Sequence, residues 1–156
     1  MEQIHRAERY LQRIQEIYEG CSHKYEEVSF YEDDVISFFI HCHHISDWII
    51  KLNRFGETKA AINKFINKHN ELIICADLCN GQKHCRLERV RGNSQPHMAG
   101  RDWSITTYTP ESGKPVTFQA KYRVLAESET YDALVLAEKC VELWRGYTRK
   151  VTLKII

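Results

Sequence analysis

The sequence predicts an α+β fold in which a helical array is followed by a β-hairpin and a final helix. Two hydrophobic patterns indicate this class. Through most of residues 1–87 apolar side chains recur every three or four positions, whereas from Trp103 they alternate with polar ones. We expect one domain over residues 1–156, with a helical core at 1–87, a hairpin at 103–125 and a final helix at 128–149.

The composition is that of an ordinary globular domain. The chain has 156 residues, of which 43% are hydrophobic and 28% charged. It contains no apolar run of about 18 residues and no basic-then-apolar leader, so we expect neither a membrane span nor a signal peptide. Six cysteines without a leader favour reduced thiols and a cytoplasmic location. The net charge of +1 gives no global reason to bind nucleic acid, which leaves local basic patches.

Three helices are expected before residue 70. In the first, over residues 2–19, apolar side chains recur at alternating three- and four-residue steps: Ile4, Ala7, Leu11, Ile14 and Tyr18. This stripe favours packing within the chain, with self-association as the alternative. A second helix covers about residues 30–53. A shorter amphipathic helix covers about residues 57–68, after the break at Gly56.

The next helix, over residues 70–87, is apolar nearly all round and therefore belongs in the core. Because helical residues are about 100° apart, Asp77, Asn80 and His84 share one narrow stripe. Polar groups in such a position need partners, since burying them unpaired is costly. Gly81, beside the stripe, indicates close approach by another helix or a ligand.

The second helix carries a matching set, His41, His44 and Asp47, along its flank. We expect the two helices to face each other and Asp47 and Asp77 each to pair with a histidine. Where such pairing outweighs desolvation, the pKa of the histidine rises above its usual value of about 6.5. The pattern leaves open whether these residues form a structural hydrogen-bond network or a working site.

Residues 86–102 predict an exposed loop, because two glycines and a proline interrupt the helical pattern. The loop is either simply solvated or a basic arm that contacts phosphates or a protein partner through Arg86, Arg89, Arg91 and Arg101. In the hairpin, residues 116–124 present one apolar face that must be buried. The final helix opens at residues 128–132, and the tail at 151–156 is a candidate edge strand.

We expect no bound metal and no cofactor. Potential ligands are numerous, but the sequence contains neither a CxxC pair nor an HExxH motif. Buried cysteine is more often a small hydrophobic residue than a ligand or nucleophile. The potential ligands are His41, Cys42, His44, Asp47, Cys75, Cys79 and His84.

The segment CNGQKH, residues 79–84, resembles the R-(N/H)-x-x-x-H motif of HEPN-domain ribonucleases. Asn80 and His84 match the second and last motif positions, and Cys79 stands where the family has arginine. The resemblance implies a four-helix HEPN-like array, a homodimer and metal-independent cleavage of RNA. The segments HCHHISDWI and ADLCNGQKH also resemble a set of uncharacterised bacterial proteins, which implies no function.

Under this resemblance His84 is a general acid or base and Asn80 orients it or the phosphate. Asp77 holds the imidazole, and Lys83 stabilises phosphate charge. Lys83 or Arg86 would compensate for the missing arginine. His41, His44 and Asp47 are supporting residues.

Two functional hypotheses follow. The first is a cytoplasmic HEPN-like ribonuclease, or a nuclease remnant, in a toxin or host–virus conflict system. The second is a non-catalytic interaction, inhibitor or accessory protein, in which the polar stripes are structural and residues 88–102 and the hairpin contact a protein partner.

Overall fold

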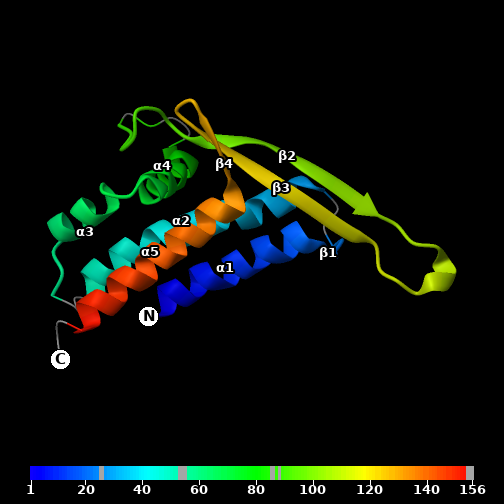
Figure 1. The fold of residues 1–156 in the computed structure, drawn as a ribbon, viewed down its shortest axis with the longest axis horizontal. Coiled ribbons are helices and arrows are strands. Elements are labelled where there is room, and N and C mark those ends of the chain that lie inside the picture. Colours follow the sequence, from blue (N-terminus) through cyan, green and yellow to red (C-terminus); the bar gives the residue numbers. More distant parts are fainter. Residues whose placement is uncertain (25–26, 53–55, 85–86, 88, 154–156) are drawn as a thin grey trace.

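Five α-helices and a small antiparallel sheet make up the described part of the chain, so the fold is α+β (Figure 1). The computed structural model describes residues 1–24, 27–52, 56–84, 87 and 89–153. The helices are α1 (Glu2–Glu19), α2 (Ser29–Leu52), α3 (Lys59–Ile66), α4 (Asn70–His84) and α5 (Ala133–Leu153). The strands are β1 (Cys21–Ser22), β2 (His97–Thr106), β3 (Thr117–Ala126) and β4 (Glu129–Asp132). A 3-10 turn, η1 (Pro110–Ser112), lies between β2 and β3.

Helix α1 uses its apolar stripe within the chain. Ile4, Ala7, Ile14 and Tyr18 are buried, and the helix packs against α2 and α5. Polar side chains occupy its other faces, as expected for a helix with one packed side. The sequence-based prediction of packing inside the chain is therefore confirmed for this helix.

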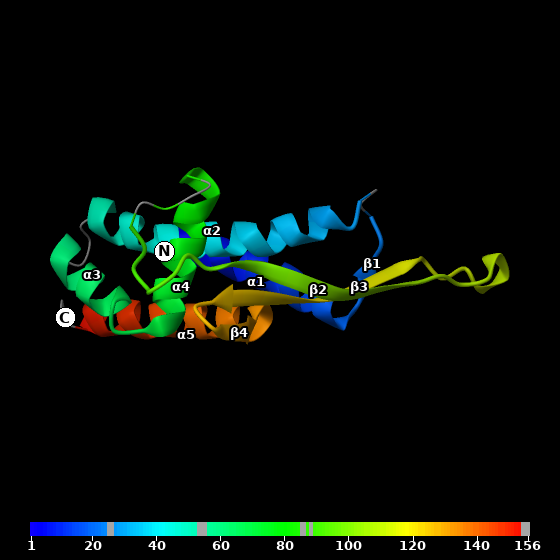
Figure 2. The same cartoon turned by 90° about the horizontal axis from the view of Figure 1, so that it is seen from above.

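Helices α2 and α4 face each other, as predicted. Figure 2 shows α4 crossing α2, and the two helices are in direct contact. The Cys75 thiol of α4 donates a hydrogen bond to the backbone oxygen of Phe39 in α2, at 3.4 Å. Helix α4 is described as far as His84, and Leu87 is not helical, so the predicted extension to that residue is wrong; residues 85–86 lie outside the described residues.

Helix α5 completes the helical layer, because it lies against α1, α2 and α4. Its buried face consists of Ala133, Leu136, Ala137, Cys140, Val141, Trp144 and Val151. The helical core therefore includes residues far beyond 87. Short helix α3 contributes Ile62 and Ile66. In the part of the chain that the structure describes, no helix is both long and apolar enough to cross a membrane.

The boundaries of α5 differ from the prediction at both ends. Residues 129–132 form β4, which pairs with β3, and the helix begins only at Ala133. The Asp132 carboxylate accepts hydrogen bonds from the backbone N–H groups of Leu134 (2.9 Å) and Val135 (3.1 Å), which satisfies two free donors of the first turn. At the other end residues 151–153 continue the helix, so the predicted edge strand is wrong there, and residues 154–156 lie outside the described residues.

Strand β3 is the centre of the sheet. It pairs antiparallel with β2 along one edge, and with β1 and β4 at the two ends of the other edge. Strand β2 begins at His97, so the last six residues of the predicted 86–102 loop, 97–102, are strand. A register shift between Met98 and Arg101, with Gly100 at a φ of +114°, interrupts the regular alternation there, which explains why the pattern did not predict the strand.

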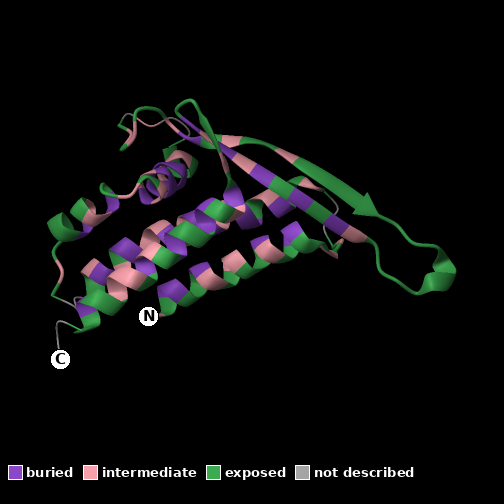
Figure 3. Cartoon of the chain, viewed as in Figure 1, coloured by how far each residue is buried: buried purple, intermediate pink, exposed green. Residues whose placement is uncertain are grey.

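The helix-facing side of β3 is buried, at Phe118, Ala120, Tyr122 and Val124, and Figure 3 shows this alternation. The matching positions of β2 differ. Trp103 pairs with Ala120 and Ile105 with Phe118, yet they are 52% and 38% exposed. The reason is visible in Figures 1 and 2, where the hairpin extends beyond the ends of the helices. The prediction of one buried apolar face is therefore confirmed for β3 and not for the outer part of β2.

Candidate functional site

A row of arginines on α1 and a set of rings on α1 and α2 form one basic–aromatic face. The face consists of Arg6, Arg9, Tyr10, Arg13, His41 and Trp48. The Tyr10 and His41 rings stack at 4.9 Å, and the Arg13 guanidinium lies 4.9 Å from the Tyr10 ring centroid. The Arg6 guanidinium lies 5.8 Å from the Trp48 ring centroid. A groove of about 520 Å³ runs along the arginine side of this face, between Arg6 and Glu16.

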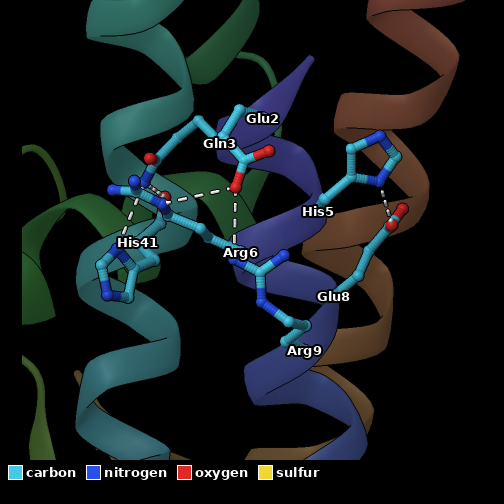
Figure 4. A network of polar contacts seen from close by, with 7 residues as sticks. All are labelled: Glu2, Gln3, His5, Arg6, Glu8, Arg9 and His41. Carbon is cyan, nitrogen blue, oxygen red and sulfur yellow. Dashed lines mark hydrogen bonds and ion pairs between the residues drawn. The ribbon is translucent and has the colours of Figure 1, made fainter.

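The polar contacts of this face are shown in Figure 4. Gln3, which is buried, donates a hydrogen bond from Nε2 to the His41 backbone oxygen at 2.8 Å and lies 3.3 Å from His41 Nδ1. The Glu2 carboxylate contacts Arg6 at 3.7 Å and Arg9 at 3.2 Å, and all three side chains are about half exposed. Burial, together with the charges of Arg6, His44 and Arg9, lowers the pKa of His41, which favours the neutral ring.

Further along α2, His43 and His44 lie near Lys83 of α4. Burial is the main cause of a lowered pKa in both histidines, and it brings the pKa of His43 to about 4. Positive charge adds to the effect, from Arg91 and Lys83 at His43 and from Lys83 and Lys51 at His44. The Asp47 carboxylate opposes the shift but does not outweigh it. The condition for a rise in pKa is therefore not met at His43 and His44, because desolvation and nearby cations exceed the effect of one exposed carboxylate.

His43 was not predicted as a site residue, because the polar flank of this helix was taken to consist of His41, His44 and Asp47. A usable signal existed, because His43 precedes Asp47 by four residues, one helical turn. In the described residues no ion pair joins Asp47 to a histidine. Asp47 therefore acts on His43 and His44 at a distance.

The α4 stripe does not form a single site. Asp77 is 1% exposed, and its Oδ2 accepts hydrogen bonds from the backbone N–H groups of Arg91 (2.7 Å) and Gly92 (3.0 Å). Lys83 and His84 are exposed and Asn80 is half buried. The expected pair of Asp77 with His84 is thus replaced by a clamp on the following loop. Burial raises the pKa of Asp77, and the two N–H donors counteract this.

Gly81 does allow a close approach, and the group that approaches it is the side chain of Gln95. A Cβ atom at this position would lie 3.1 Å from Nε2 of Gln95, in the loop that Asp77 clamps. The Gln95 Oε1 atom also accepts a hydrogen bond from the Leu87 backbone N–H at 2.8 Å. Gly81 therefore allows the loop side chain Gln95 to pack on α4.

The four arginines expected to bind phosphate or a partner have different surroundings. Arg91 donates to the side-chain oxygens of Asn67 (2.8 Å) and Asn63 (3.1 Å), which ties the loop to α3. Arg101 forms an ion pair of 2.6 Å with Glu32 of α2. Arg89 is exposed, and Arg86 lies outside the described residues. Arg91 and Arg101 hold the fold together, so they are poor candidates for a free basic arm.

One group of potential metal ligands occurs within the described residues. The thiols of Cys42, Cys75 and Cys140 lie within 4.8 Å of one another, and all three are buried. The histidines and aspartates of α2 and α4 do not form such a group with them in this part of the chain. Cys79, at the position of the family arginine, is also buried.

Comparisons with protein-family models, curated proteins and solved structures found no match to this chain.

Proposed function

We propose that this chain binds single-stranded RNA on the basic–aromatic face and cleaves it without a metal ion, as a HEPN-like ribonuclease. The observation that carries the proposal is the layering of guanidinium groups and rings on α1 and α2. Guanidinium groups attract phosphates without regard to sequence, and rings offer stacking platforms to unpaired bases. The two kinds of group lie side by side here, with Arg13 over Tyr10 and Arg6 over Trp48.

The arginines differ in how free they are to bind phosphate. Arg6 and Arg9 share the exposed Glu2, and exposed ion pairs contribute only about 0–1 kcal/mol, so a phosphate can displace the carboxylate. Arg13 is paired with the nearly buried Asp34 at 3.0 Å. We therefore assign phosphate binding to Arg6 and Arg9, and we assign Arg13 to holding the Tyr10 ring in place.

The acid–base part of the proposal rests on α2 and α4. His44 has a lowered pKa and is neutral near pH 7, so it is able to accept a proton from a ribose 2′-hydroxyl. Lys83, whose charge acts on His44, is placed to stabilise the developing negative charge on the phosphate. His84, exposed at the end of α4, is the candidate acid, and half-buried Asn80 is the candidate orienting residue.

The resemblance to HEPN ribonucleases covers Asn80 and His84 only, and buried Cys79 cannot contact phosphate in place of the family arginine. Arg6, Arg9 and Lys83 would supply the positive charge instead. The resemblance also implies a four-helix HEPN-like array, a homodimer and action in the cytoplasm in a toxin or host–virus conflict system. We propose these with the activity, and light scattering on the purified chain measures the oligomeric state.

The binding half is tested by filter binding of a labelled, unstructured RNA over a range of salt concentrations. The double variant Arg6→Gln/Arg9→Gln should bind at least about 10-fold more weakly and lower the salt slope by about 1.4, at about 0.7 per lost phosphate contact. The control Arg145→Gln/Arg149→Gln removes the same charge from α5 and should bind like the unaltered chain. An equal loss of RNA affinity in both double variants would show that binding is non-specific electrostatic attraction, and it would refute the proposal.

The cleavage half is tested with the same RNA in excess chelator. Cleavage should persist, and His44→Ala and His84→Ala should each slow it by about 10²–10⁴-fold. His5→Ala, which changes an exposed histidine of α1, is the control. Activity that needs a divalent ion, or that is unchanged in both variants, would contradict this mechanism.

A second candidate function, protein binding, is favoured by one observation. Trp103 and Ile105 are exposed on the helix-facing side of the hairpin, in continuity with the core residue Phe118, and the Trp103 and Phe118 rings lie 6.3 Å apart. An exposed, connected apolar surface of this kind is typical of an interaction site. If it is the working surface, Trp103→Ser/Ile105→Ser should abolish binding to a partner isolated from the native host, whereas Arg6→Gln/Arg9→Gln should not.

A further inference from the structure

Three thiols from three different helices meet in the core. Cys42 belongs to α2, Cys75 to α4 and Cys140 to α5, and their Sγ atoms all lie within 4.8 Å of one another. Each residue is at most 1% exposed. No other part of the described chain brings three potential ligand atoms so close together. The cluster is buried, whereas the side chains of the basic–aromatic face are exposed or half buried, and it plays no part in the proposed RNA chemistry.

The thiols are protonated in the free protein. Cys75 donates to the Phe39 backbone oxygen and Cys140 to the Glu71 backbone oxygen, both at 3.4 Å, and a donor sulfur carries its hydrogen. All three side chains are buried, so a charge left among them would be without solvation. Any ligand must therefore replace three S–H hydrogens without leaving charge in the core.

This requirement selects the ligand. A divalent ion held by three thiolates leaves one net negative charge, and a monovalent ion leaves two. A trivalent centre leaves none. Arsenous acid is itself uncharged near neutral pH, and it condenses with three thiols to form three As–S bonds and release three water molecules: As(OH)₃ + 3 RSH → As(SR)₃ + 3 H₂O. No electron is transferred, and the product is neutral.

The geometry is close to what such a centre needs. Trivalent arsenic is pyramidal because it carries a lone pair, so at a thiolate bond length of about 2.3 Å and bond angles of about 100° its three sulfurs lie about 3.5 Å apart. The three Sγ atoms therefore need to approach one another by at most about 1.3 Å, which small rotations of the three side chains within their rotamer wells supply. We propose that Cys42, Cys75 and Cys140 form a binding site for trivalent arsenic, held as a neutral three-sulfur complex that links α2, α4 and α5.

The test uses the reduced chain of residues 1–156 with Cys21 and Cys85 replaced by serine, so that these two thiols do not contribute. Native mass spectrometry after incubation with arsenite should show a gain of one arsenic atom less three hydrogens. A two-sulfur adduct keeps one hydroxyl and is heavier by one water, so the mass distinguishes the two. The three-sulfur adduct should also raise the thermal midpoint of the folded chain.

Two single variants and one matched control complete the design. Cys75→Ala and Cys140→Ala should each lower arsenite affinity by at least about 100-fold, because an intramolecular third thiol acts at a high effective concentration. Cys79→Ala removes a buried cysteine one turn after Cys75 in α4, outside the cluster, and should leave the affinity unchanged. Circular dichroism shows which variants remain folded.

The proposal is overturned by any of three results: a two-sulfur adduct in the folded chain, equal loss of affinity in Cys79→Ala, or an adduct that forms only after denaturant is added. Zinc ion, titrated in parallel, should bind more weakly, because its three-thiolate complex is charged. Tighter binding of zinc than of arsenite would refute the charge argument.

Discussion

The Asp77 carboxylate holds the turn at residues 91–92 against α4 through two backbone N–H groups. Removing it in Asp77→Ala leaves both donors without their acceptor, and each unsatisfied buried donor costs about 1–3 kcal/mol. We expect the free energy of unfolding to fall by about 3 kcal/mol. Asp77→Asn should cost about 1 kcal/mol, because an amide oxygen still accepts. Urea denaturation at pH 7 measures both, and a loss below about 0.5 kcal/mol for the alanine variant would contradict the clamp.

The lowered pKa of His43 leads to a prediction of how the free energy of unfolding depends on pH. Its folded pKa is about 4, below the unfolded value of about 6.5, so the unfolded chain binds more protons between these two values. The free energy of unfolding should therefore decrease as pH falls from 6.5 towards 4, by up to about 3 kcal/mol. His43→Gln should flatten this part of the profile, and His5→Gln, on the exposed face of α1, should not. A stability that rises on acidification over this range would refute the assignment.

For single residues, the sequence predicted that polar side chains on the helices are buried, but it did not predict their hydrogen-bond or charge partners. The all-round apolar pattern of α4 correctly indicated that Asp77 is buried. The N–H groups that donate to its carboxylate, however, belong to residues 91–92. The path of these residues depends on contacts with α3 and α4 that no local pattern encodes. The same limit applies to His44, whose cationic neighbour Lys83 is 39 residues away in sequence but close in space.

At the scale of elements, the outer end of the hairpin is largely free of the core, although the Val116 oxygen at its base accepts a hydrogen bond from the His23 N–H at 2.8 Å. Thr106 and Thr117 are paired, and residues 107–116 between them contain η1 and are largely exposed. Replacing these ten residues by Asn-Gly, which favours a tight two-residue turn, should change the free energy of unfolding by less than about 0.5 kcal/mol. Thermal unfolding measures the change. A loss above about 2 kcal/mol would show that the loop stabilises the fold.

Element type was predictable where the hydrophobic period is long and regular, as in α1, α2 and β3. It was not predictable in short segments whose structure depends on a neighbour. Strand β4 has only four residues and exists because it pairs with residues 123–126 of β3. The first residues of β2 carry a bulge at Gly100 and little alternation, so they resemble a loop in sequence.

For the whole molecule, Tyr18 joins the helical layer to the sheet. β1 covers one end of β3 and β4 the other, and between them the Tyr18 hydroxyl donates to the Tyr122 backbone oxygen (3.0 Å) and accepts from its N–H (2.9 Å). Tyr18→Phe leaves this buried pair without partners and should lower the free energy of unfolding by about 2–3 kcal/mol. Tyr108→Phe, on the exposed hairpin, is the control and should have little effect. Equal results for the two variants in urea denaturation would contradict this role.

The arrangement of the helices was only partly predictable. Each apolar stripe indicates that a helix is packed, but it does not name the neighbour. The last helix was expected to follow the core, whereas α5 lies within it, in contact with α1, α2 and α4. The three-thiol cluster arises from this placement, because Cys140 reaches Cys42 and Cys75 only when α5 packs against both α2 and α4.

The three tryptophans occupy three different environments, so the fluorescence of each indole can report on a different part of the molecule. Trp144 is 1% exposed in the core, Trp48 lies beside Arg6 on the basic–aromatic face, and Trp103 is half exposed on the hairpin. Indole emission shifts to the red with exposure to water, and iodide quenches only rings that it can reach. In chains that keep a single tryptophan, with the other two changed to phenylalanine, protection of Trp48 from iodide would report occupancy of the RNA face. Protection of Trp103 from iodide would report a protein bound to the hairpin. The emission wavelength of Trp144 would report whether the core is intact.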